Sequence, residues 1–206
     1  MSRLDWCRNT DWNESIEQVF EEKLRRARHK HQYLRIQANI LSGSHPAVAL
    51  RLLERYFALD KAFDWALACC DQASAFLSLG RIDEAITAYE RALDREAEFP
   101  TVKTRAYLDL PFLIATRTLS DRFDRALQIL GEHRSQLTFP VDRFMWHAAF
   151  ALIANCRCES SSASDHASRA LIEATRLHSG FQAHPTVGLV SQPHQRVIDE
   201  LTAIIS

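Results

Sequence analysis

Glycine and proline are scarce in this chain, which has five glycines and six prolines among 206 residues. Both residue types interrupt regular secondary structure, so their scarcity favours helices over a sheet with many tight turns. The glycines form no glycine-rich phosphate-binding loop, and none frames a nucleophile in a sharp strand-to-helix turn. The sequence therefore gives no support to a catalytic site, and we expect a protein that is not an enzyme.

Long apolar runs and an excess of one charge are also absent. The longest uninterrupted apolar run covers residues 148–154, far below the roughly 20 residues that cross a bilayer, and the net charge is −1. We therefore expect no membrane partner. Nucleic acid is disfavoured as a partner even for the basic run at residues 23–35, because a cluster of glutamates precedes it. The first residues lack the apolar core of a secretory signal, so we expect a cytoplasmic protein.

The five cysteines are an odd number at irregular spacings, which argues against a disulfide framework and favours buried free thiols. Two close pairs invite a metal site, namely His29 with His31 and Cys156 with Cys158. Residues two apart on a helix point about 200° away from each other, so neither pair can chelate a metal from a regular helix. We expect no metal and no cofactor. A metal-dependent or nucleic-acid-acting enzyme that uses these four residues is the remote alternative.

Helical periodicity is the strongest positive signal in the sequence. Small and apolar residues recur every three or four positions on both sides of Gly80, which breaks the chain between two helices. Each of these helices has a single apolar face, so a hairpin of two such helices needs a neighbour to cover it. Similar stripes recur along the chain, and they predict an all-α protein.

Gly80, Ala85, Tyr89 and Ala92 follow one another at a spacing that resembles the tetratricopeptide repeat. Phe76 stands where the family has a tyrosine. Cys69, Gln72 and Ala73 stand where the family has tryptophan, leucine and glycine, and the family proline is displaced to Pro100. The opening of the chain is similar to short bacterial tetratricopeptide proteins of unassigned role at Trp12, Phe20, Leu24 and residues 26–28 and 33–37. The resemblance implies a right-handed solenoid whose first helices line a concave groove for a peptide or partner protein.

The predicted solenoid has about four hairpins in a single domain, with a helix at each end. Candidate equivalent alanines fall at positions 49, 85, 126 and 167, and arrays of this kind tolerate insertions because each unit contacts only its neighbours. A serine-rich connection is expected at residues 160–164. The expected segments are an N-terminal arm and helix at 1–28, repeats at 29–60, 61–99, 100–138 and 139–180, and a capping segment at 181–206.

Polar residues that interrupt the first helices are the candidate partner-binding residues. Arg35 and Asp71 lie the same number of positions before Ala49 and Ala85, so they occupy the same repeat position and should point the same way. They could equally pair with each other across neighbouring helices, and for His147 a structural role between helices is favoured. The full predicted set is Arg35, Asn39, Asp71, Ser74, Ser78, Arg105, Arg117, His147 and Asn155.

These patterns predict a non-catalytic interaction module, such as an adaptor or chaperone-like protein, that binds a peptide or protein in the concave groove. Binding of this kind depends on a few anchors in desolvated pockets with a polar rim. The alternative is an immunity or inhibitor protein that neutralises a bacterial toxin or effector. The exposed surfaces of the first or last repeat could also form a homodimer.

Overall fold

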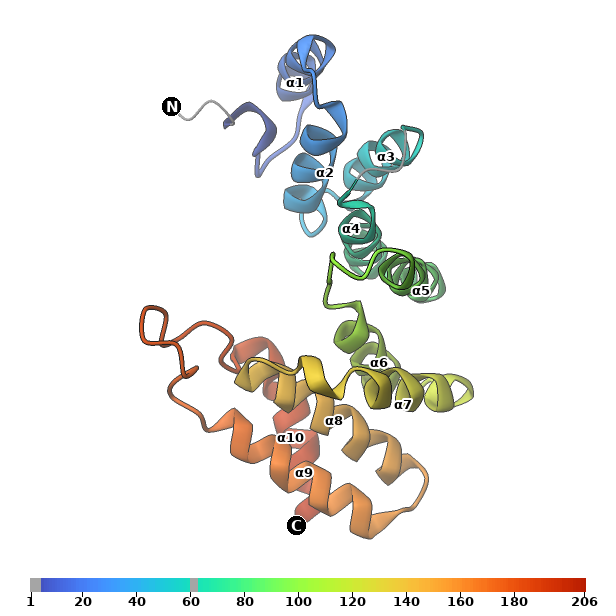
Figure 1. Ribbon diagram of the computed structural model, residues 1–206, viewed down its shortest axis with the longest axis vertical. Coiled ribbons are helices and arrows are strands. Elements are labelled where there is room, and N and C mark those ends of the chain that lie inside the picture. The colour runs from blue at the N-terminus through green and yellow to red at the C-terminus, as the bar shows by residue number, and fades with distance from the viewer. Residues whose placement is uncertain (1–4, 60–62) are drawn as a thin grey trace. The chain divides into compact units, whose positions relative to one another are not determined.

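The computed structural model describes residues 5–59 and 63–206, and this part of the chain contains helices and no strand (Figure 1). The all-α prediction is thereby confirmed for these residues. No helix among them is both long and apolar enough to cross a membrane. The α-helices are α1 (Glu14–Arg26), α2 (Lys30–Leu41), α3 (Pro46–Phe57), α4 (Trp65–Ser78), α5 (Ile82–Glu98), α6 (Ala106–Thr116), α7 (Phe123–Glu132), α8 (Pro140–Cys156), α9 (Ser160–Ala174) and α10 (Gln195–Ile205). The short 3-10 helices are η1 (Asp5–Cys7), η2 (Ser120–Arg122), η3 (Arg134–Gln136) and η4 (Gln192–His194).

The chain divides into two compact units, unit 1 (Met1–Ala106) and unit 2 (Tyr107–Ser206). In unit 1 the most extensive packing joins consecutive helices, α2 with α3 and α4 with α5, and α3 also packs on α4. In unit 2 the most extensive packing joins α8 with α9, and α10 packs on both. Consecutive helices therefore form hairpins within each unit, as the periodicity predicted.

Local sequence sets several of the helix ends. Asn13 caps α1, because its side-chain oxygen accepts the Ile16 backbone N–H at 3.0 Å. Pro46 is in the first turn of α3, where its missing donor costs nothing. Gly80 has a φ of 72°, a left-handed conformation that favours glycine, and it separates α4 from α5. The sequence therefore carries the signals for the hairpin turn at residues 79–81.

The serine-rich segment was predicted as a connection, and this prediction is wrong, because α9 begins at Ser160. Serine has only a modestly unfavourable helix propensity, which tertiary packing readily overrides. Ala163, Ala167 and Ala170 are fully buried and form the stripe by which α9 packs on α8. The helix therefore extends through the serines to bring Ala163 into the core.

The second helices of the two hairpins in unit 1 bury equivalent stripes. Ala49, Leu52, Leu53 and Tyr56 are buried in α3, and the residues 36 positions later are buried in α5. Those equivalents are Ala85, Ala88, Tyr89 and Ala92. A stripe of four matched positions in successive hairpins is typical of a tandem repeat, in which each unit shares its apolar face with its neighbour.

The described residues 5–12 of the N-terminal arm pack against α1 and α2, and only Asp5–Cys7 among them form a short 3-10 helix. The Trp6 ring centroid lies 5.4 Å from that of Phe20 and 4.8 Å from that of Tyr33. Gln37 is fully buried and exchanges hydrogen bonds with Asn9: its Oε1 accepts the Asn9 backbone N–H at 3.0 Å, and its Nε2 donates to the Asn9 carbonyl at 2.7 Å. This segment therefore closes the outer side of the first hairpin.

In unit 2 the segment before α10 returns to α8. The Val141 N–H donates to the Gly188 carbonyl at 2.9 Å, and the His194 ring lies 5.4 Å from the Phe144 ring and 6.1 Å from the Phe112 ring. Phe144 belongs to α8 and Phe112 to α6, the two helices predicted as first helices of the later repeats. The chain's own C-terminal segment thus covers part of the first-helix surface in unit 2.

Candidate functional site

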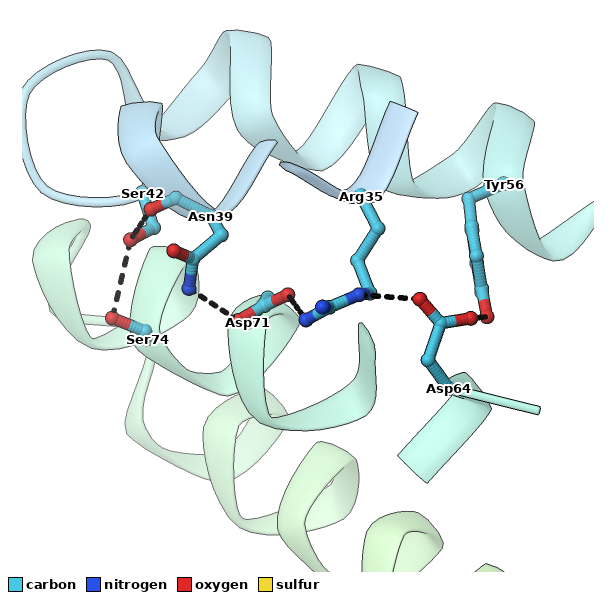
Figure 2. Close-up of polar contacts among 7 residues, drawn as sticks. All are labelled: Arg35, Asn39, Ser42, Tyr56, Asp64, Asp71 and Ser74. Carbon is cyan, nitrogen blue, oxygen red and sulfur yellow. Dashed lines mark hydrogen bonds and ion pairs between the residues drawn. The ribbon is translucent and has the colours of Figure 1, made fainter. Parts of the chain in front are cut away.

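Five of the polar side chains in unit 1 form one connected network between α2, α3 and the start of α4 (Figure 2). Arg35 donates through Nε to Asp64 Oδ2 at 2.6 Å and through Nη1 to Asp71 Oδ2 at 3.1 Å. Asn39 Nδ2 donates to Asp71 Oδ1 at 2.6 Å. The Tyr56 hydroxyl donates to Asp64 Oδ1 at 2.8 Å. The structure therefore brings together three of the predicted residues, Arg35, Asn39 and Asp71, and it realises the predicted alternative in which Arg35 and Asp71 pair with each other.

The network is held in a poorly hydrated environment. The side chains of Arg35, Asp64 and Asp71 are only 22%, 19% and 9% exposed. Burial raises the pKa of the Asp71 carboxyl, while the Arg35 charge and the Asn39 hydrogen bond act in the opposite direction. Burial also raises the pKa of the Tyr56 hydroxyl, and its hydrogen bond to Asp64 adds to this effect. Two carboxylates thus share one guanidinium whose fork geometry reaches both of them.

This geometry makes the network a brace between helices. Arg35 donates through Nε and Nη1 to two carboxylates of unit 1, so its charge is already paired within the protein. Breaking a buried ion pair from one side leaves an uncompensated charge, and this cost fixes α2 against α4. Asp64 and Tyr56 are the members that sequence reasoning missed. Asp64 lies just before α4, and only the tertiary packing shows that it faces Arg35.

A hollow with an apolar floor lies elsewhere in unit 1, between α3 and α5 and over one face of α4. We call it the α3–α5 groove, and it has a volume of about 650 Å³. Its lining comprises Ala47, Leu50, Arg51, Glu54, Phe57, Gln72, Phe76, Leu79, Arg81 and Arg91. At 100° per residue along α4, Gln72 and Phe76 lie on a different face from Asp71 and Ser74. The groove and the brace are therefore separate features of the same two hairpins.

No family model, curated protein or solved structure matches this chain. The tetratricopeptide resemblance of residues 76–92 thus stays a prediction from the sequence.

The remaining predicted residues of unit 1 lie at or near the surface. Ser74 is half-buried, and its hydroxyl is 3.4 Å from that of Ser42, which in turn donates to the Asn39 carbonyl at 2.8 Å. Ser78 is exposed and its hydroxyl donates to the Ser74 carbonyl at 3.0 Å. Arg105 is exposed at the end of unit 1. The serines therefore extend the network along α4, while Arg105 does not join it.

The three predicted residues of unit 2 are dispersed. Arg117 is exposed in the turn after α6. Asn155 is exposed near the end of α8 and lines a hollow of about 420 Å³ between α8, α10 and the end of α6. His147 lies in the middle of α8, where its Nδ1 is 3.0 Å from Nδ1 of His166 in α9. These residues share no common site in unit 2.

His147 and His166 form a half-buried pair beside aromatic rings, which fits the structural role predicted for His147. The His166 ring stacks on Phe150 at a centroid distance of 4.8 Å, and Trp146 donates through Nε1 to the Leu130 carbonyl at 3.0 Å. Burial lowers the pKa of His147 to about 4, with the neighbouring His166 as the next cause. Burial also lowers the pKa of His166. Sequence reasoning missed His166, although its position beside the Ala163–Ala170 stripe of α9 marked it as near the core.

We predict that this histidine pair makes the protein acid-sensitive. Between the ordinary pKa of 6.5 and the value of about 4 in the folded protein, the unfolded chain binds a proton that folded His147 does not, so stability falls as the pH drops through this window. The charged groups that act on the pair are Arg134, Asp165, Arg169 and Glu173. Urea unfolding at several pH values should show that His147→Gln loses less stability than the wild type between pH 6.5 and pH 4. Parallel pH profiles of the two proteins would contradict the prediction.

The candidate metal ligands do not assemble into a larger site in the part of the chain that is described. Within residues 5–59 and 63–206, no group of three His, Cys, Asp or Glu residues could hold a metal ion. Cys7 and Cys69 are buried thiols, as predicted, but Cys156 and Cys158 are exposed and correct that prediction. The reason is local: α8 ends at Cys156, and Cys158 has a φ of 59° in the turn to α9.

Proposed function

We propose that this protein is a non-catalytic interaction module built from tetratricopeptide-like helix hairpins, and that unit 1 binds a peptide or protein segment in the α3–α5 groove. The observation that carries the proposal is the groove itself. Its volume of about 650 Å³ falls in the range of roughly 300 to 1,000 Å³ that is usual for ligand sites. Its lining combines apolar side chains with a few polar ones, which is the usual composition of such sites.

The repeat character of unit 1 supports the proposal. Four buried positions of α3 recur 36 residues later in α5, and the sequence around Gly80 resembles the tetratricopeptide repeat. Such arrays act mainly through the extended surfaces between successive units. A groove between the second helices of two successive hairpins is a surface of this kind.

The polar brace supports the proposal in a different way. The first-helix face was predicted as the binding surface, but Arg35 there pairs with both Asp71 and Asp64. We assign these side chains the role of fixing the two hairpins in register. A fixed register pre-forms the α3–α5 groove, and a pre-formed site avoids the entropic cost of ordering it on binding.

The proposal is tested by selecting binders from a displayed random peptide library against the full chain. The selected peptides should lose about tenfold or more in affinity for Leu79→Ser, because the loss of one apolar anchor costs at least about 1.4 kcal/mol. Leu79 is 42% exposed, so its replacement leaves the core intact. Ile205→Ser is the matched control, since Ile205 is 43% exposed at the end of α10 and is not among the residues that line the groove.

Two results would contradict the proposal. One is a library that yields no binder. The other is a set of binders whose affinities change equally for Leu79→Ser and Ile205→Ser, which would place the binding surface outside the α3–α5 groove.

A further inference from the structure

Arg91 is the residue of the α3–α5 groove that most sharply limits what can bind there. Its guanidinium carbon lies 4.8 Å from the centroid of the Phe57 ring and 4.9 Å from that of the Trp65 ring. Its Nη1 donates to Gln72 Oε1 at 3.0 Å. Among residues 5–59 and 63–206, no carboxylate forms an ion pair with Arg91. A half-buried cation is thus held in place by two rings and an amide, and no carboxylate of the described residues compensates its charge.

This arrangement orients Arg91 for an external anion. The rings of Phe57 and Trp65 fix the guanidinium plane through cation–π contacts. Guanidinium has five N–H donors in a rigid fork that matches a carboxylate, and the Gln72 contact engages a single nitrogen. The side-chain entropy that a carboxylate contact normally costs an arginine is therefore already lost in the free protein.

The rest of the groove lining has the same charge preference. Arg51 and Arg81 also line the groove, and Glu54 is the one carboxylate among the described residues of its lining. Arg51 pairs with Glu17 at 2.7 Å and Arg81 pairs with Glu84, but all four side chains are between 37% and 52% exposed. Exposed pairs of this kind contribute about 0–1 kcal/mol, so a ligand carboxylate can displace their acidic partners at little cost.

The apolar part of the lining narrows the class of ligand further. Leu50, Phe76 and Leu79 lie beside the arginines in the same hollow. A nucleic-acid strand would present a phosphate at every nucleotide, whereas this groove offers apolar side chains between its cations and carries Glu54 as well. A polypeptide that alternates acidic and large apolar side chains matches both parts of the lining.

We infer that the ligand of the α3–α5 groove is an acidic segment of a partner protein, in which an Asp or Glu pairs with Arg91 and a neighbouring large apolar side chain packs on Leu50, Phe76 and Leu79. This inference rests on the proposed function and deepens it by naming the chemistry of the partner. It adds a role for Arg91 that does not depend on the predicted first-helix residues.

The test uses a fluorescein-labelled peptide from the library selection and a twin in which Asn and Gln replace every Asp and Glu. Fluorescence anisotropy should show that the acidic peptide binds wild type about tenfold or more tightly than its neutral twin. Arg91→Gln should remove most of this preference. In a double-mutant cycle, Arg91 and one peptide carboxylate should show a clear coupling, a readout that a merely destabilised variant does not produce.

Matched variants separate the groove from the general surface charge. Arg51→Gln and Arg81→Gln should each weaken the acidic peptide severalfold, since both arginines line the groove. Arg26→Gln is the control, because Arg26 also pairs with a glutamate on its own helix and lies outside the groove. Equal effects of all three variants would overturn the inference, because they would indicate attraction by net charge alone.

The outcomes distinguish the inference from the proposed function. Binders that depend on Leu79 but tolerate neutral replacement of their acids would overturn the inference and leave the proposed function standing. A peptide selection without groove binders would overturn both. An oligothymidylate probe that binds with a dependence on Arg91, where acidic peptides fail to bind, would also overturn both in favour of nucleic acid.

Discussion

Arg35→Ala is expected to lower the free energy of unfolding of unit 1 by about 3 to 5 kcal/mol, the usual cost of removing one partner from a buried ion pair. The substitution would leave Asp64 and Asp71 without their shared cation, and their side chains are only 19% and 9% exposed. The two carboxylates, both on the α4 side of the interface with α2, would then repel each other without a cation between them. Urea unfolding followed by tryptophan fluorescence measures the change, since three of the four tryptophans lie in unit 1.

Arg26→Ala provides the control for this experiment. Arg26 pairs with Glu22 at 3.1 Å, but its side chain is 81% exposed, so its loss should cost no more than about 0.5 kcal/mol. If Arg35→Ala proved as mild as Arg26→Ala, the network would be a surface feature and the brace assigned to it would not exist. A difference of several kcal/mol with an unchanged denaturant slope would support the brace.

Phe20→Ala is the second substitution with a large expected effect, a loss of about 3 to 5 kcal/mol in the stability of unit 1. Phe20 is fully buried in α1, and its ring lies 5.4 Å from that of Trp6 and 5.5 Å from that of Trp12. Removing it would leave a cavity between two rigid indoles that cannot collapse into the space. Thermal or urea unfolding measures the loss, and the native tryptophan emission should shift as water reaches the indoles.

Phe63→Ala makes the same chemical change at a site that is 78% exposed. It should alter stability by no more than about 0.5 kcal/mol. Equal effects of the two substitutions would mean that Trp6 of η1 and Trp12 do not pack on Phe20 of α1.

Features that depend on short-range patterns were predictable from the sequence. The apolar stripes predicted the helices because apolar residues recur every three to four positions. Gly80 predicted a turn because glycine readily adopts a positive φ, and in the structure its φ is 72°. The equal numbers of residues from Arg35 to Ala49 and from Asp71 to Ala85 predicted that both lie at the same repeat position, and pairing between them was one of the two alternatives that this position left open. Each of these inferences needed only spacing.

Features that depend on long-range packing were not predictable. Asp64 pairs with Arg35 29 residues away, and no local pattern distinguishes it from a helix cap. The Arg91 site needs Phe57, Trp65 and Gln72 from two other helices or helix ends. The hydrogen bond between Gly188 and Val141 of α8 joins residues that are distant in the sequence, and no periodic pattern predicts it. Such contacts arise from the stacking of the hairpins, which a single sequence does not specify residue by residue.

The brace also restricts how this array could be rebuilt. Arg35 of the α2–α3 hairpin pairs with Asp71 at the same repeat position of the α4–α5 hairpin. The two hairpins therefore carry opposite charges where they meet. If the α4–α5 hairpin were copied in tandem, aspartate would face aspartate at the new junction, and if the α2–α3 hairpin were copied, arginine would face arginine. Opposite charge at this position therefore disfavours tandem duplication of either hairpin, because each copy would need a charge-reversing substitution at the new junction.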